Sequence, residues 1–256
     1  SLSGEAIGIY AARDPEEIAA ALAACRRCLD EEAWFYSADE RGALAFFPHV
    51  VRATLHVDAT AAGEAVPVRV TVLDPAGAEV TRFVAIGPTD RDLVPGSYHV
   101  AVSHGLEYYV HEADVTLADG ATATVTAMLP RAIDTTGLIG TDFHLHSELS
   151  TDSRHRVDDA LRMIAAEGLE LVASTDHDYL TDYADVAAGA GVAAWLVTVT
   201  GEEVSSTVYG HLGGYPLARD AALAGGGAVV WLDANVLDAI AGIRARGDAA
   251  LGGALV

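Results

Sequence analysis

The periodicity of apolar residues changes near residue 130 of this 256-residue chain, and this change constrains the fold more than any other feature. Between about residues 48 and 130, apolar and polar residues alternate, which is typical of half-buried β-strands. In VPVRVTV, for example, one strand face would carry Val66, Val68, Val70 and Val72. Beyond Pro130, helical patterns alternate with short apolar runs, which favours an α/β domain. We therefore expect two folded parts with a boundary at residues 130–138.

The first part contains further β-type runs at RATLHVD, EVTRFVAI, SYHVAVS, YYVHEADVTLA and ATATVTAML, with DPAG and PG as turns. This spacing predicts an antiparallel β-sandwich over residues 48–132. The stretch DLVPGSYHVAVSHG resembles small immunoglobulin-like domains related to carboxypeptidase regulatory modules. The histidines of this part have no ligand spacing, and we interpret them as ordinary strand or loop residues: His49, His56, His99, His104 and His111.

The second part, residues 138–256, alternates helix and strand signals. RVDDALRMIAAEG predicts a helix with Val157, Leu161 and Ile164 on one face, which Gly168 would end. LELVAST and AWLVTVT are short apolar strands. VWLDANVLDAIAGIRARG predicts a second helix with a single apolar stripe, made of Leu232, Val236, Ile240 and Ile243.

Residues 1–47 precede the sandwich, and their pattern predicts a helical segment. Over residues 14–35, Asp14 would cap a helix and Pro15 would suit its first turn. Cys25 and Cys28 form a CxxC pair within this helix. Because no second CxxC accompanies it, we interpret the pair as packing residues rather than as a metal or redox site.

The charge balance excludes some functions. The chain has 15 basic and 37 acidic residues and a net charge of −22, which argues against binding to nucleic acid or to anionic membranes. No run approaches the roughly 20 apolar residues of a membrane-spanning helix. The first residues, SLSGEAIGIY, lack a basic region and a long apolar core, so we do not expect a signal peptide.

The sequence TDFHLHSELSTD at residues 141–152 contains the first chemical signal. His144 and His146 lie two residues apart, so they would face the same side of an extended strand and could converge on one ion. An isolated HxH is weak evidence, because two histidines on a strand face are often simply exposed.

Further histidines and carboxylates follow the next predicted strands. STDHD places Asp176, His177 and Asp178 after LELVAS, and TGEEVS places Glu202 and Glu203 after AWLVTV. Ligands of α/β sheets gather at such strand ends. GHLGGY then adds one more histidine, His211. Imidazole and carboxylate are the ligands of metals that activate water, so the pattern predicts a metal site.

The order HxH, Asp, TDH, G-x-E and His, over residues 142–215, resembles the PHP family, named for polymerase and histidinol phosphatase. HSELSTDS, STDHDYLTDYADV and GHLGGYPL are most similar to its carbaryl-hydrolase-like branch, which can carry a β-sandwich before the PHP domain. The resemblance implies a distorted βα barrel that holds two or three divalent ions, commonly zinc, manganese or iron. It also implies hydrolysis by metal-activated water, without a Ser or Cys nucleophile.

The resemblance also implies roles for single residues. His144 and His146 would bind the first ion, and Asp152 with His177 would hold a second. Glu203, rather than Glu202, would bridge, and His211 would complete another shell. Asp176 and Asp178 are candidates for orienting the ligands, although either would equally cap a loop. Arg154 and His155 lie near Asp152 and would either touch an anionic group or remain surface residues.

The sequence departs from the family after His211. The family supplies a later His and a closing Asp-x-His pair, whereas this chain has no histidine beyond His211. Residues 138–256 are also short for a closed barrel, and the chain ends in the apolar stretch ALGGALV. We therefore expect an incomplete barrel in a fragment of a longer protein, in which the missing ligands would follow shortly after residue 256.

Two functions remain open from the sequence. The first is a metal-dependent hydrolase of a small-molecule phosphoester or of a carbamate or carboxylic ester. The scarcity of basic residues near the motifs leans toward a less charged substrate. The second is a non-catalytic module that binds metal or a partner through an incomplete site. The sequence does not assign the metal, the oligomeric state or the compartment.

Overall fold

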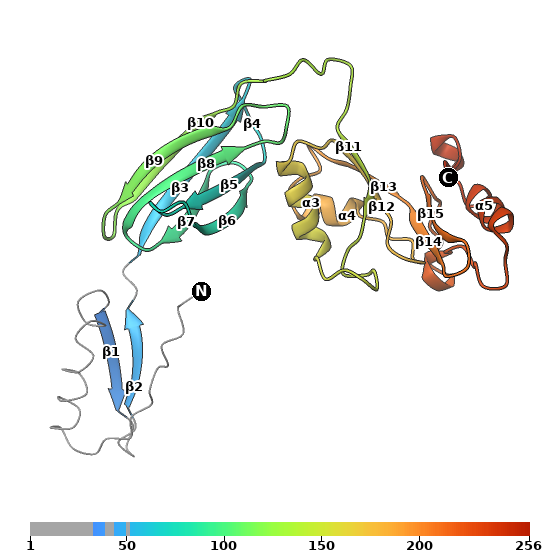
Figure 1. Ribbon diagram of the computed structural model, residues 1–256, viewed down its shortest axis with the longest axis horizontal. Helices are drawn as coiled ribbons and strands as arrows, with labels where there is room; N and C mark the ends of the chain where they lie inside the picture. Colours follow the sequence, from blue (N-terminus) through green and yellow to red (C-terminus); the bar gives the residue numbers. More distant parts are fainter. Residues whose placement is uncertain (1–32, 39–43, 50–51) are drawn as a thin grey trace. The chain divides into compact units, whose positions relative to one another are not determined.

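The computed structural model describes residues 33–38, 44–49 and 52–256 (Figure 1). The predicted helix over residues 14–35 lies outside this range except for its last three residues, and Cys25 and Cys28 also lie outside it. β1 (Ala33–Ala38) pairs antiparallel with β2 (Leu44–His49). The expected helical segment is therefore wrong at residues 33–38 and 44–47, because AWFYSA and LAFFPH are rich in aromatic residues that favour strands.

The β-rich part contains two four-stranded sheets. In one sheet β3 (Ala53–Ala61) pairs with β4 (Glu64–Ala65), β7 (Thr89–Leu93) and β10 (Thr122–Met128). The other sheet has the order β6-β5-β8-β9 and consists of β5 (Val68–Leu73), β6 (Glu79–Ala85), β8 (Gly96–Ser103) and β9 (His111–Leu117). The expected β-type runs are thus strands, and their sheets are sandwich-like.

The alternating pattern explains why one face of β5 is buried. Val68, Val70 and Val72 are at most 1% exposed, whereas Arg69 and Thr71 are half-buried. β5 pairs antiparallel with both β6 and β8, so its backbone groups form hydrogen bonds on both sides. The preceding valine, Val66, lies outside the strand.

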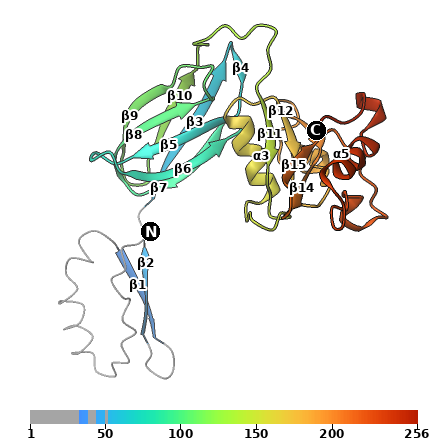
Figure 2. The same ribbon diagram turned by 45° about the vertical axis from the view of Figure 1, so that its right-hand side comes forward.

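The second part is built on a three-stranded parallel sheet in the order β11-β12-β13, whose strands are all labelled in Figure 1 and of which Figure 2 labels β11 and β12. The strands are β11 (Thr141–Leu145), β12 (Leu171–Ser174) and β13 (Val197–Thr200). α3 (Val157–Ala166) and α4 (Ala184–Gly189) form the two connections. Because the strands are parallel, their carboxyl ends meet at one edge of the sheet.

The face of α3 that the sequence predicts to be apolar is the face that packs into the core. Val157, Leu161 and Ile164 are at most 9% exposed and belong to a core that also contains Val172 of β12 and Tyr183. Gly168 has a φ of +73°, which suits the turn that follows the helix.

A two-stranded antiparallel sheet and one helix complete this part. β14 (Glu202–Ser206) pairs with β15 (Gly210–Gly214), and α5 (Val236–Ala245) packs through Ile243. A Cβ atom at Gly214 would lie 2.5 Å from Ile243 Cγ2, so the glycine is what permits this close contact. Two short 3-10 turns, η1 (Ala224–Gly226) and η2 (Ala249–Leu251), flank α5.

The predicted second helix begins later than expected. Asn235 caps α5 and forms a capping box with Asp238, so the helix starts at Val236 rather than near Trp231. Leu232 consequently lies outside the helix and is 68% exposed, and the buried positions are Ala239 and Ile243.

The architecture is a β-rich mixed fold. None of the sheets in the described residues closes on itself, and their pairing gives no evidence of the expected incomplete βα barrel. No helix of the described range is long and apolar enough to span a bilayer.

Candidate metal centre

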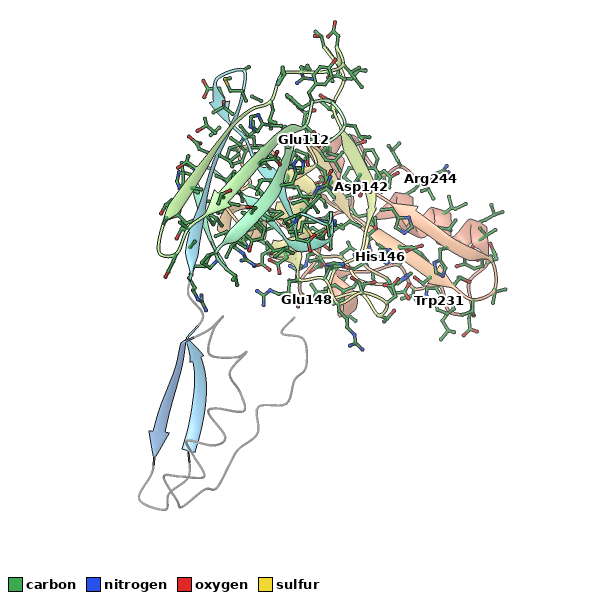
Figure 3. All side chains as sticks on the ribbon, turned by 60° about the vertical axis from the view of Figure 1, so that its left-hand side comes forward. Glu112, Asp142, His146, Glu148, Trp231 and Arg244 are labelled. Atoms are coloured by element: carbon green, nitrogen blue, oxygen red, sulfur yellow. The ribbon has the colours of Figure 1, made fainter. Side chains whose placement is uncertain are left out.

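The carboxyl edge of the parallel sheet brings the predicted ligands together. His144 lies in β11 and His146 directly after it, and His177 follows β12 (Figure 3 labels His146). Glu203 follows β13 and lies in β14, where it also forms a parallel bridge with His177. His211 lies opposite Ser205 on β15. Together with Asp152, these side chains form three groups whose ligand atoms lie near enough to hold a metal ion.

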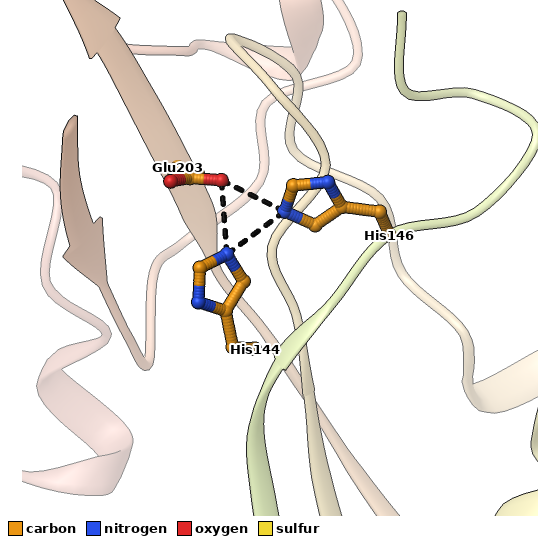
Figure 4. Close-up of side chains that lie close together, drawn as sticks. All are labelled: His144, His146 and Glu203. Carbon is orange, nitrogen blue, oxygen red and sulfur yellow. Dashed lines mark hydrogen bonds and ion pairs between the residues drawn. The ribbon is translucent and has the colours of Figure 1, made fainter. Parts of the chain in front are cut away.

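His144, His146 and Glu203 form the first group (Figure 4). The Nε2 atoms of the two histidines are 3.0 Å apart. Glu203 Oε2 lies 3.0 Å from His144 Nε2 and 2.7 Å from His146 Nε2. Bonds of about 2.0–2.1 Å around one ion would separate neighbouring ligand atoms by about 2.9 Å at right angles and by about 3.3 Å at the tetrahedral angle that zinc prefers. The lone pairs of these three atoms repel one another unless protons or a cation lie between them. The triangle therefore has the size and the chemistry of a cation site.

The second group consists of His146, Asp152 and His177. His146 Nδ1 lies 3.0 Å from both carboxylate oxygens of Asp152, and His177 Nε2 lies 3.3 Å from Asp152 Oδ2. A neutral imidazole has only one lone pair, so His146 can ligate only one ion. With its Nε2 in the first group, its Nδ1–H donates to Asp152, which fixes the orientation of the ring.

His177, Glu203 and His211 form the third group, which places Glu203 at the centre of the whole cluster. Glu203 Oε1 lies 2.9 Å from His211 Nδ1, whereas Oε2 faces His144 and His146 and lies 3.5 Å from His177 Nδ1. The two oxygens of this buried carboxylate thus face different imidazoles, which is the geometry of a bridging ligand.

The electrostatics favour ionised carboxylates in the cluster. Burial raises the pKa of Glu203, but the hydrogen bonds of His144 and His211 outweigh this effect and keep the pKa below its usual value. The hydrogen bond from Ser150, assisted by His146, holds the pKa of Asp152 well below its usual range. Both carboxylates therefore carry the negative charge that a cation would bind.

Asp176 holds the ends of β11 and β12 together. Its buried carboxylate accepts hydrogen bonds from Ser147 N at 2.7 Å and Ser147 Oγ at 2.9 Å, directly after His146. It also accepts from Thr181 Oγ1 at 2.8 Å and Tyr183 OH at 2.9 Å. None of these donors belongs to a candidate ligand, and the carboxylate instead fixes the backbone that directly follows His146.

Asp178 acts on the neighbouring strand. Its carboxylate accepts from Ser205 N at 3.0 Å, and its own N–H donates to Glu203 O at 3.1 Å. Its φ of +53° is a left-handed conformation that Asp tolerates better than most residues. Asp178 therefore fixes the start of β14, which carries Glu203.

Glu202 points away from the cluster. It is fully buried, and its two carboxylate oxygens accept from Val229 N at 2.9 and 3.0 Å. Burial raises the pKa of Glu202 to about 8. Arg154 and His155 are exposed, and the backbone of His155 is held by Ser153 Oγ and Glu148 N.

Two serines close to the ligands were missed by the sequence analysis. Ser150 Oγ donates to Asp152 and accepts from His177 N, and Ser205 contacts the ring of His177. A signal for Ser205 existed, because alternation along a strand places it on the same side as Glu203.

The comparisons with known proteins do not identify a relative. No protein-family model and no curated protein match the chain. Among solved structures, the minor pilin GBS52 of Streptococcus agalactiae is 14% identical, with a TM-score of 0.29 over 41% of this chain and 56% of the pilin. Phospholipase PlaB of Legionella pneumophila is 12% identical, with a TM-score of 0.31 over 48% of this chain and 33% of the phospholipase. Likenesses this distant carry no argument about fold or activity.

Proposed function

We propose that the chain is a metal-dependent hydrolase whose ions, held by His144, His146, Asp152, His177, Glu203 and His211, serve to activate water. The observation that carries the proposal is the central position of Glu203, whose two oxygens face different histidines. Divalent zinc, manganese or iron in such sites lowers the pKa of water and stabilises the negative charge that develops during ester hydrolysis. The substrate class is a phosphoester or a carbamate or carboxylic ester.

Each residue has a defined task in this proposal. His144 binds through Nε2, which faces Glu203 Oε2, and His146 binds through Nε2 because its Nδ1–H donates to Asp152. Glu203 bridges with its two oxygens, and Asp152 both orients His146 and faces Nε2 of His177. The resemblance to the PHP family predicts the same six ligands, and two or three ions when its full set of ligands is present.

The test combines an activity screen with two neighbouring variants. The metal-reconstituted chain is assayed with an aryl phosphodiester, an aryl N-methylcarbamate and an aryl carboxylic ester. Glu203→Gln should abolish hydrolysis, because the amide cannot bridge two cations. Glu202→Gln is the matched control: its amide oxygen still accepts from Val229 N, so the activity should remain close to that of the wild type.

Two outcomes would contradict the proposal. Hydrolysis that survives in Glu203→Gln would place the chemistry elsewhere. A chain that takes up its ions but hydrolyses none of the three esters would favour the alternative, a non-catalytic module that binds metal or a partner.

A further inference from the structure

The side chain of Ser205 lies between a ligand ring and the backbone of β14. Its hydroxyl is in hydrogen-bond contact with His177 Nδ1, and the same oxygen lies 2.8 Å from the backbone oxygen of Glu203. Both contacts use one hydroxyl, which has a single proton to donate and two lone pairs to accept with.

Counting protons assigns the direction of both hydrogen bonds. The backbone oxygen of Glu203 can only accept, so the contact at 2.8 Å requires the proton of Ser205. If this proton instead pointed to His177, Ser205 Oγ and the backbone oxygen of Glu203 would face each other at hydrogen-bond distance without a proton between them. The contact with His177 must therefore be donated by the ring, through Nδ1–H.

We infer that Ser205 is a positioning residue that holds His177 as the Nδ1–H tautomer and leaves Nε2 as its only metal-binding atom. The inference rests on the proposed function, because it assigns the ring to an ion. Nε2 is the atom 3.3 Å from Asp152 Oδ2, whereas Nδ1 is the atom 3.5 Å from Glu203. His177 accordingly binds beside Asp152 and does not ligate through Nδ1.

Backbone hydrogen bonds also fix the position of Ser205. Its N–H donates to Asp178 Oδ1 at 3.0 Å, and β14 pairs it with His211 on β15. Removing a residue that orients a metal-bound histidine in this way typically lowers the metal affinity about 10–100-fold. Ser205 has the place of such a residue, although it touches no reacting atom.

The direct test is nitrogen NMR of the histidine side chains in the whole chain, labelled with ¹⁵N-histidine. The signals of His177 are assigned by their loss in His177→Asn, and the tautomer is read before and after addition of Zn²⁺. We expect the proton on Nδ1 in the metal-free chain, and Zn²⁺ on Nε2 after loading. A proton on Nε2 in the metal-free wild type would overturn the inference.

Variants of Ser205 provide a second, independent readout. Ser205→Ala should weaken Zn²⁺ binding by about 10–100-fold. Ser205→Thr keeps the hydroxyl and should restore the affinity, and Thr207→Ala, which removes an exposed hydroxyl from the adjoining turn, should leave it unchanged. Unchanged affinity in Ser205→Ala would overturn the inference. If the wild type binds no metal, the proposed function fails, whereas the tautomer is still read from the metal-free spectrum.

Discussion

Replacing Asp176 should destabilise the second part of the chain, because this carboxylate joins two strand ends. It is 0% exposed and accepts hydrogen bonds from Ser147, Thr181 and Tyr183. The backbone N–H of Ser147 has no freedom to find another acceptor, whereas the three hydroxyls can rotate. Alanine at position 176 therefore leaves one or two buried donors unpaired.

The expected magnitude follows from these contacts. A buried donor without a partner costs about 1–3 kcal/mol, so one or two such donors in Asp176→Ala should lower the free energy of unfolding by about 1–6 kcal/mol. Asp176→Asn keeps one oxygen for the Ser147 N–H, and its amide can donate to hydroxyls that turn round to accept. It loses only the charge assistance of its hydrogen bonds, so its cost should be about 1–2 kcal/mol.

Urea unfolding of the two variants and the wild type measures this difference. Asp185→Asn, an exposed change on α4, is the control and should lie within about 0.5 kcal/mol of the wild type. The reasoning would be refuted if Asp176→Ala also lay within that margin, or if Asp176→Asn cost as much as Asp176→Ala.

Three further predictions concern other buried groups. Burial lowers the pKa of His104 below its usual value, so the folded chain should lose stability as pH falls below about 6.5, and urea unfolding of His104→Gln should show a smaller loss. Glu202→Ala leaves the N–H of Val229 unpaired and should cost about 1–3 kcal/mol in the same assay, whereas Glu202→Gln should cost less. Gly201→Ala would place a Cβ 2.7 Å from the backbone oxygen of Gly214 and should lower the free energy of unfolding by about 1–3 kcal/mol. The melting temperature of the variant should therefore fall, and an unchanged melting temperature would contradict this contact.

The secondary structure was most predictable where one face of an element is buried. The valines of β5 and the stripe of α3 are examples, because apolar spacing directly reflects the side that is packed. The start of α5 was not predicted correctly, because the Asn235 cap overrides an apolar pattern that continues back to Leu232. Closure of the sheet into a barrel depends on long-range pairing, which local spacing does not encode.

The candidate site was predictable to the level of residue types at strand ends. Parallel strands bring their carboxyl ends to one edge, so His144, His177 and Glu203 could be expected to meet. Alternation along a strand places Glu202 and Glu203 on opposite sides, but only the family resemblance indicated which of the two faces the site. The contacts of Ser205 and the hydrogen bonds of the Asp176 carboxylate depend on the direction of individual side chains, which the sequence pattern leaves open.

The number of metal ions bound per chain tests the central claim most directly. Elemental analysis is performed on the 256-residue chain after reconstitution with zinc, manganese or iron and removal of the excess. We predict that the wild type retains two ions or more, and that a variant with His144 and His146 both changed to Ala retains fewer. Less than half an equivalent in the wild type, or an unchanged content in the variant, would contradict the metal centre.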